Sequence, residues 1–183
     1  GAAEGGLSPQ PDVEAVVVPV GGGGLISGVA LAVKSRSSGQ PKARVYGVQA
    51  KACPAAAMAF RQGHIVAVHP APTIADGIAV GRPGDYTFEF IRRYVDDIVT
   101  VGEEEVAHAM VLLLERSKLL VEGAGAVGLA ALLSKSLPCQ GQRVVVVLSG
   151  GNVDPMLLSR ILDHGLAQAG RYLMLQVVVR DRP

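Results

Sequence analysis

The chain has 183 residues, which is enough for one domain or slightly more. Hydrophobic residues make up 49% and charged residues 18%, so the chain can bury a sizeable core and extensive disorder is not expected. Its 17 Lys and Arg residues are balanced by 16 Asp and Glu residues, which leaves a net charge of +1. This balance provides no basic field for nucleic acid or for an anionic membrane surface.

Cysteine and histidine usage narrows the class of protein further. Cys53 and Cys139 are far apart, which favours a reducing compartment such as the cytoplasm over a disulfide framework. The four histidines show no metal-ligand spacing, and we expect no metal there. The longest apolar stretch, residues 16–33, contains Pro19 and four successive glycines, so it is not expected to cross a membrane. No signal peptide is visible.

Segments with strand and helix patterns alternate along the chain. After a loop or remnant at residues 1–12, the sequence predicts strands at residues 13–20, 44–50, 97–101, 143–148 and 171–179. It predicts helices at residues 25–34, 54–62, 86–94, 103–116, 122–136 and 154–167. Residues 35–42 read as a polar connector, and residues 64–84, rich in Pro and Gly, as a long structured loop that is often functional at such a length.

The apolar strands do not alternate in polarity, as expected of strands buried on both faces. The predicted fold is therefore α/β, with three layers: a largely parallel sheet that carries helices on both faces. The segment at residues 143–148 is the most apolar strand, and we expect it at the centre of the sheet.

The sharpest motif follows the first strand and opens the first helix. It is a run of four glycines before Leu25, namely Gly21, Gly22, Gly23 and Gly24. Backbone N–H groups converge in such a turn, and the helix dipole favours negative charge, so the motif predicts a phosphate site. A flexible linker is the alternative.

Two common phosphate patterns do not fit this run. Val29 and Ala30 follow Gly28 where a P-loop needs Lys and Ser or Thr, and Ser27 replaces the third glycine of the dinucleotide pattern. A single terminal phosphate on a cofactor fits better.

Three further motifs are ambiguous when each is taken alone. Ser149 follows the strand at 143–148, where a ligand would bind at the carboxyl end of a parallel strand, but it could also cap a helix. Asp76 and Gly77 lie in a segment that could be a surface turn. Glu122 precedes Gly-Ala-Gly-Ala and could be only an acid near a helix N-terminus.

Taken in order, these motifs resemble threonine ammonia-lyase (threonine dehydratase), of the serine/threonine dehydratase family of fold type II pyridoxal-phosphate enzymes. The matching segments are VVVPVGGGGLISG at 16–28, PTIADGIAVGRPG at 72–84, YVDDIVTV at 94–101, LLVEGAGAVGLAALL at 119–133 and VVLSGGNVD at 146–154. The resemblance implies deamination of L-threonine and L-serine to a 2-oxo acid and ammonia, with pyridoxal 5'-phosphate as the cofactor.

The resemblance also implies roles for individual residues. The four glycines and Leu25 would hold the cofactor phosphate, and Ser149 would hydrogen-bond the pyridine nitrogen. Gly77, with Asp76 beside it, and Glu122 would lie near the reaction centre.

The sequence departs from the family pattern in three respects. The lysine that holds the cofactor as a Schiff base belongs to a motif that is absent here, so residues 13–168 resemble the C-terminal part of the catalytic domain, inactive without an N-terminal half. Residues 169–183 resemble the start of a small ACT-like regulatory domain. Gln49 and Ala55 take the places of a Glu and an Asp that bind a divalent cation in some relatives, so we expect no metal.

Several alternatives remain open from the sequence alone. The parent could be a serine racemase or serine dehydratase relative, with a small amino acid as substrate and a homo-oligomeric assembly. The chain could be a non-catalytic short form that binds full-length subunits or a phosphorylated ligand. An unrelated nucleotide-binding α/β domain is a third interpretation.

Overall fold

Parallel strands form the centre of the structure, a computed structural model that describes residues 13–35 and 43–168 together with Gly170, Arg171, Leu173, Leu175 and Val177. The strands are β1 (Ala15–Pro19), β2 (Arg44–Ala50), β3 (Asp97–Val101) and β4 (Val144–Val146). Within this part of the chain they pair in the order β3-β2-β1-β4, and every pair is parallel.

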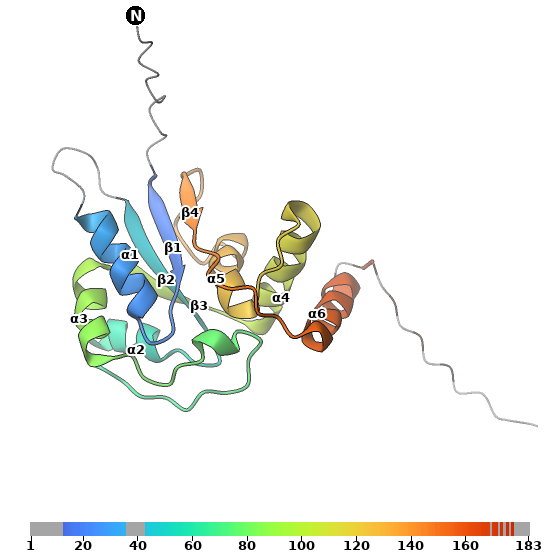
Figure 1. Ribbon diagram of the computed structural model, residues 1–183, viewed down its shortest axis with the longest axis horizontal. Coiled ribbons are helices and arrows are strands. Elements are labelled where there is room, and N and C mark those ends of the chain that lie inside the picture. Colours follow the sequence, from blue (N-terminus) through green and yellow to red (C-terminus); the bar gives the residue numbers. More distant parts are fainter. Residues whose placement is uncertain are drawn as a thin grey trace, which may run out of the picture.

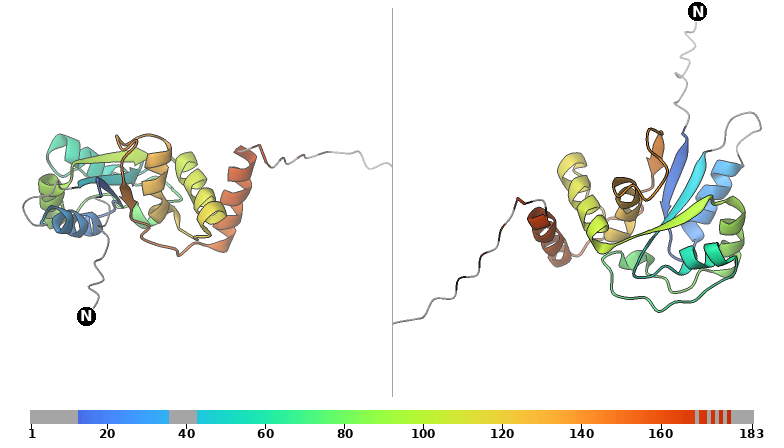
Figure 2. Two further views of the ribbon diagram at one scale, coloured as in Figure 1. Left: turned by 90° about the horizontal axis from the view of Figure 1, so that it is seen from above. Right: turned by 180° about the vertical axis from the view of Figure 1, so that it is seen from behind.

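Helices cover both faces of the sheet (Figure 1). One face carries α1 (Gly24–Lys34), α2 (Ala55–Gln62) and α3 (Asp85–Tyr94). The other carries α4 (Glu103–Leu112), α5 (Gly123–Leu133) and α6 (Pro155–Gln168). Figure 2 shows α6 as the outermost of these, beyond α4. Two short elements complete the set, the 3-10 helix η1 (Asp76–Ile78) and the π-helical turn η2 (Leu113–Ser117).

Successive residues of β1 explain why the apolar strands lack polar alternation. Val16 and Val18 pack in one core with Ile26 of α1, whereas Ala15 and Val17 pack in a second core with Val127 of α5. Because side chains of a strand alternate between faces, a strand covered on both sides is apolar throughout. The predicted three-layer α/β fold is confirmed.

The predicted central position of the strand at 143–148 is wrong. Among the described residues β4 pairs only with β1 and forms an edge of the sheet, and Val145 is 44% exposed. The apolar run correctly indicates a strand, but composition does not determine strand order. An apolar composition shows how much burial a strand requires. The described residues cover β4 only in part.

The other predicted elements agree closely with the structure where it describes them. The strands at 44–50 and 97–101 match β2 and β3, and the helix at 103–116 appears as α4 continued by η2. Of the predicted strand at 171–179, Arg171, Leu173, Leu175 and Val177 are described, and none of them is in a strand. Residues 1–12 and most of the connector lie outside the described residues. No helix in the described ranges is long and apolar enough to cross a bilayer.

Candidate cofactor site

The order of the strands creates a topological switch between β1 and β4. From β1 the chain moves to β2 and β3 on one side, and β4 then returns to the other side of β1. Ligands of open parallel sheets bind where the strand order reverses in this way, at the carboxyl ends of the strands. The glycine run follows β1 and Ser149 follows β4, so both leave the sheet at this point.

A cavity of about 300 Å³ brings the predicted motifs together. Its lining comes from four separate segments: the end of β1 with the glycine run, the long loop with η1, the start of α5, and the turn after β4. The lining residues are Pro19, Gly21, Gly22, Gly23, Gly24, Leu25, Gly77, Ile78, Val80, Glu122, Ala124 and Ser149. The four glycines, Leu25, Gly77, Glu122 and Ser149 are all among them, whereas Asp76 is not.

The glycine run is a tightly held turn and not a linker. Gly23 has a φ of 97°, and a Cβ there would lie 2.8 Å from Ile91 Cδ1 and 2.9 Å from Thr87 Oγ1. A Cβ on Gly24, in contrast, would meet no atom within 4 Å. Packing and backbone conformation therefore require glycine at position 23. At position 24 glycine leaves the cavity open.

The N-terminus of α1 provides donors for an anion. It has no side-chain cap and no acidic residue in its first turn. The first N–H groups of a helix have no partner within it, and the helix dipole makes this end favourable for negative charge. A cradle of bare backbone that opens to a cavity fits a phosphate group.

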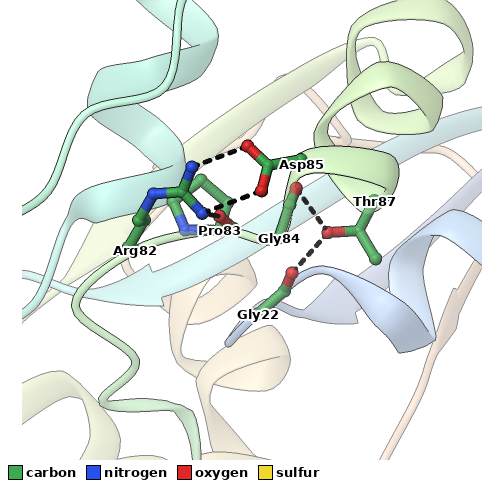
Figure 3. A network of polar contacts seen from close by, with 6 residues as sticks. All are labelled: Gly22, Arg82, Pro83, Gly84, Asp85 and Thr87. Atoms are coloured by element: carbon green, nitrogen blue, oxygen red, sulfur yellow. Dashed lines mark hydrogen bonds and ion pairs between the residues drawn. The ribbon is translucent and has the colours of Figure 1, made fainter.

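Residues around the start of α3 hold the glycine run in place, and no motif in the sequence pointed to Thr87 among them (Figure 3). Thr87 Oγ1 donates a hydrogen bond to the Gly22 carbonyl at 2.6 Å, and the Gly84 N–H donates to the same oxygen at 3.1 Å. Just before them, Arg82 pairs with Asp85 through both carboxylate oxygens, at 2.6 and 3.2 Å. This hydrogen bonding to Arg82 holds the pKa of Asp85 below its usual range.

Gly77 packs closely against the start of α5 in the wall of the cavity. A Cβ on Gly77 would lie 3.1 Å from the Ala124 Cβ and 3.5 Å from Glu122 Oε1. The Gly77 N–H donates to the side chain of the preceding residue, Asp76 Oδ1, at 2.8 Å. Since that hydrogen bond engages the N–H, what Gly77 allows is the close approach to α5 that a side chain would prevent. Asp76 is exposed beside it.

Glu122 connects the start of α5 to the turn that carries Ser149. Its N–H donates to the Gly150 carbonyl at 3.1 Å, and its Oε2 accepts the Asn152 N–H at 3.2 Å. A Cβ on Gly150 would collide with this carboxylate, so the small residue allows the contact. Ser149 itself is exposed, and α6 is capped by Asp154, whose Oδ1 accepts the Met156 N–H at 2.7 Å. Ser149 is thus not the helix cap of the alternative interpretation.

Gln49 of β2 is fully buried on the face of the sheet that carries α2. Its Nε2 donates to the Val20 carbonyl at 3.1 Å and its Oε1 accepts the Ala57 N–H at 2.9 Å, so both ends of the amide are engaged. The described part of the chain holds no group of three or more His, Cys, Asp or Glu residues that could bind a metal ion. Cys53 and Cys139 are free and buried, and burial raises the pKa of both thiols.

The fold and this cavity define a cofactor-dependent α/β enzyme domain, and the comparisons with known proteins give its family. The profile of the pyridoxal-phosphate dependent enzymes matches residues 4–150. The chain belongs to this family, whose cofactor is pyridoxal 5'-phosphate.

Relatives with known activities resemble the chain over nearly all of its length. It is 51% identical to the L-threonine ammonia-lyase of Thermotoga maritima and 50% identical to that of Geobacter sulfurreducens, in both cases over 97% of this chain and 43% of the relative. The chain therefore spans less than half the length of these relatives.

Solved structures agree with this assignment. A T.th. threonine deaminase is 42% identical with a TM-score of 0.72, covering 78% of this chain and 51% of that one. Maize serine racemase is 36% identical with a TM-score of 0.74, covering 82% of this chain and 48% of that one. These neighbours support the fold type II assignment that the sequence motifs predicted.

Proposed function

We propose that the complete polypeptide carrying this chain deaminates L-threonine, and L-serine, to a 2-oxo acid and ammonia, and that this chain supplies the side of the site that binds the cofactor phosphate and ring nitrogen. The observation that carries the proposal is the cavity at the switch between β1 and β4, where four motifs from distant parts of the sequence meet. The threonine ammonia-lyase relatives support the choice of reaction.

The residues present fit the cofactor. The N–H groups at Gly21, Gly22, Gly23, Gly24 and Leu25 would bind the phosphate at the uncapped end of α1. Bound pyridoxal phosphate supplies an electron sink for bond cleavage at the α-carbon of an amino acid.

Ser149 and Glu122 would set the electronic environment. A neutral hydroxyl from Ser149 at the ring nitrogen would limit its protonation, which a carboxylate would promote, and this favours β-elimination over transamination. Glu122, held by the Asn152 N–H, places a carboxylate on the wall of the same cavity beside Gly77.

Among the described residues that line the cavity there is no lysine. We therefore propose that the lysine that holds the cofactor comes from a part of the longer protein outside this sequence, and that this chain alone does not catalyse the reaction. The length comparison supports this, because the chain accounts for 43% of each of the two relatives.

We also propose an arrangement for the parent protein. An N-terminal half of the catalytic domain would cover the exposed edge at β4, and residues 169–183 would lead into an ACT-like regulatory domain. The parent would be a cytoplasmic homo-oligomer. The partly covered β4 supports the first of these points, since an unpaired apolar edge strand promotes association.

A coupled assay of 2-oxo acid formation tests the proposed function. With added pyridoxal phosphate, the complete polypeptide should release 2-oxobutanoate from L-threonine and pyruvate from L-serine, and this chain alone should release neither. Formation of D-serine without release of 2-oxo acid would replace the proposal by a racemase, which the similarity to maize serine racemase makes the second candidate. Activity of this chain alone would contradict the assignment of the lysine to another segment.

A further inference from the structure

The peptide group between Gly22 and Gly23 is held by a side chain that does not line the cavity. Thr87 Oγ1 lies 2.6 Å from the Gly22 carbonyl oxygen, and the two residues are 65 positions apart in the sequence. The Gly84 N–H reaches the same oxygen at 3.1 Å. Thr87 Oγ1 also lies 3.0 Å from the Gly84 carbonyl oxygen (Figure 3). The two donors lie just before α3 and in its first turn, and neither Gly84 nor Thr87 lines the cavity.

This contact fixes the direction of an N–H group. In a trans peptide the carbonyl and the following N–H point in opposite directions, so a Gly22 carbonyl directed at α3 turns the Gly23 N–H away from α3. The cavity lies on that side, since Gly22 and Gly23 line it and no described residue of α3 does.

Without such a restraint a run of four glycines could easily flip this peptide. Glycine populates positive and negative φ about equally, so rotation of the Gly22–Gly23 peptide is not opposed by side-chain clashes. The flipped form would present a carbonyl oxygen to the anion in place of an N–H. Thr87 also packs under Gly23, where a Cβ would lie 2.9 Å from its Oγ1.

A second hydrogen bond joins Thr87 to α1. Ser27 Oγ, in the first turn of α1, donates to the Thr87 carbonyl at 3.1 Å. The side chain of Ser27 is buried, and the bond joins the first turns of α1 and α3 on either side of the glycine run. Each helix start thus fixes the other, and the loop between β1 and α1 is fixed with them.

We propose that Thr87 is a positioning residue for the phosphate cradle: its hydroxyl holds the Gly22–Gly23 peptide in the orientation that presents the Gly23 N–H to the cofactor phosphate. The inference rests on the proposed cofactor site, and it adds a residue that touches neither cofactor nor substrate. The hydroxyl acts before binding, by pre-organising the loop.

Thr87→Val in the complete polypeptide tests this, because valine keeps the branched shape and removes the hydroxyl. Thr87→Ser is the matched control that keeps the hydroxyl. The readout is equilibrium binding of pyridoxal phosphate and of pyridoxal, which lacks the phosphate, followed by absorbance. We expect Thr87→Val to weaken pyridoxal phosphate binding roughly 10-fold, the effect of about one hydrogen bond, with pyridoxal binding unchanged and Thr87→Ser close to wild type.

The other outcomes separate the possible failures. Equal weakening of both ligands by Thr87→Val would show a general structural role and overturn the proposal. Unchanged binding of both ligands would also overturn it, while leaving the cofactor site intact. Wild-type protein that does not distinguish pyridoxal phosphate from pyridoxal would instead contradict the proposed phosphate cradle itself. Inorganic phosphate as competitor gives a second readout, since it should lose affinity for the Thr87→Val variant in parallel with the cofactor.

Discussion

Glu103 and Thr73 are joined across 30 positions of sequence by a hydrogen bond of 2.6 Å between Oγ1 and Oε1. The second carboxylate oxygen of Glu103 accepts the Ile74 N–H at 2.7 Å. Thr73 and Ile74 lead directly into η1, which brings Gly77 to the cavity. The start of α4 therefore anchors the segment that forms one wall of the site.

Glu103→Gln should destabilise this anchor. The amide carries no charge, and its NH2 group can face the Thr73 hydroxyl only if that hydroxyl accepts instead of donating, so two charge-assisted hydrogen bonds are replaced by weaker ones. We expect a loss of about 1–3 kcal/mol in the free energy of unfolding. Urea denaturation with an unchanged m-value is the measurement. Glu89→Gln, on the exposed face of α3, is the control and should change stability by less than about 0.5 kcal/mol. If the two substitutions had equal effects, Glu103 would not anchor this segment.

Gly23→Ala should be among the most disruptive single-atom additions in the loop. Alanine at a φ of 97° costs about 1–2 kcal/mol, and overpacking against Ile91 and Thr87 adds about 1–3 kcal/mol. Gly28→Ala is the matched control, since it lies in α1 with no atom within 4 Å of a new Cβ, and it should stabilise the helix by about 0.5–1 kcal/mol. Thermal unfolding of both variants distinguishes them. A Gly23→Ala protein as stable as wild type would mean that the loop is not held as described.

Glu105 provides a prediction about pH. Burial opposes its ionisation, but the Gly102 N–H, 2.7 Å from Oε2, and the nearby Lys51 outweigh burial and hold its pKa below the usual value. A lowered folded-state pKa stabilises the fold above the ordinary carboxyl pKa of about 4.3, and that contribution disappears as the pH falls through the folded-state value.

Glu105→Ala should therefore cost about 1 kcal/mol or less at pH 7, because the side chain is 35% exposed, and the cost should shrink below about pH 4. Glu105→Gln can still accept the Gly102 N–H, so it serves as the control without a charge. Chemical denaturation across this pH range measures both. A cost for Glu105→Ala that does not vary with pH would show that ionisation plays no part.

The sequence is sufficient to predict most elements and several of the segments that line the cavity. Apolar runs locate β1, β2 and β3, and the motifs around Ser149, Gly77 and Glu122 line one cavity with the glycine run. Single motifs are ambiguous because each also occurs as an ordinary turn. Their order along the chain resolves the ambiguity, because it is the ordered set that resembles the family and implies one common site.

What the sequence does not predict depends on contacts between distant segments. Thr87 and Glu103 are ordinary helix-start residues in the sequence, and only the packing of α3 and α4 shows what they hold. The sequence also does not predict the position of β4, because strand order follows from the connections and the available neighbours and not from composition. Gln49 stands out in the sequence only as a departure from a cation site, whereas its amide bridges Val20 and Ala57.

The most direct test of the central claim is titration of this purified chain with pyridoxal phosphate, followed by borohydride reduction and intact-mass measurement. The account predicts weak binding that inorganic phosphate competes away, and no specific lysine adduct after reduction. That result would mean that the glycine cradle binds phosphate while the lysine belongs to another part of the protein. A single specific adduct on a lysine of this chain, or binding insensitive to phosphate, would contradict it.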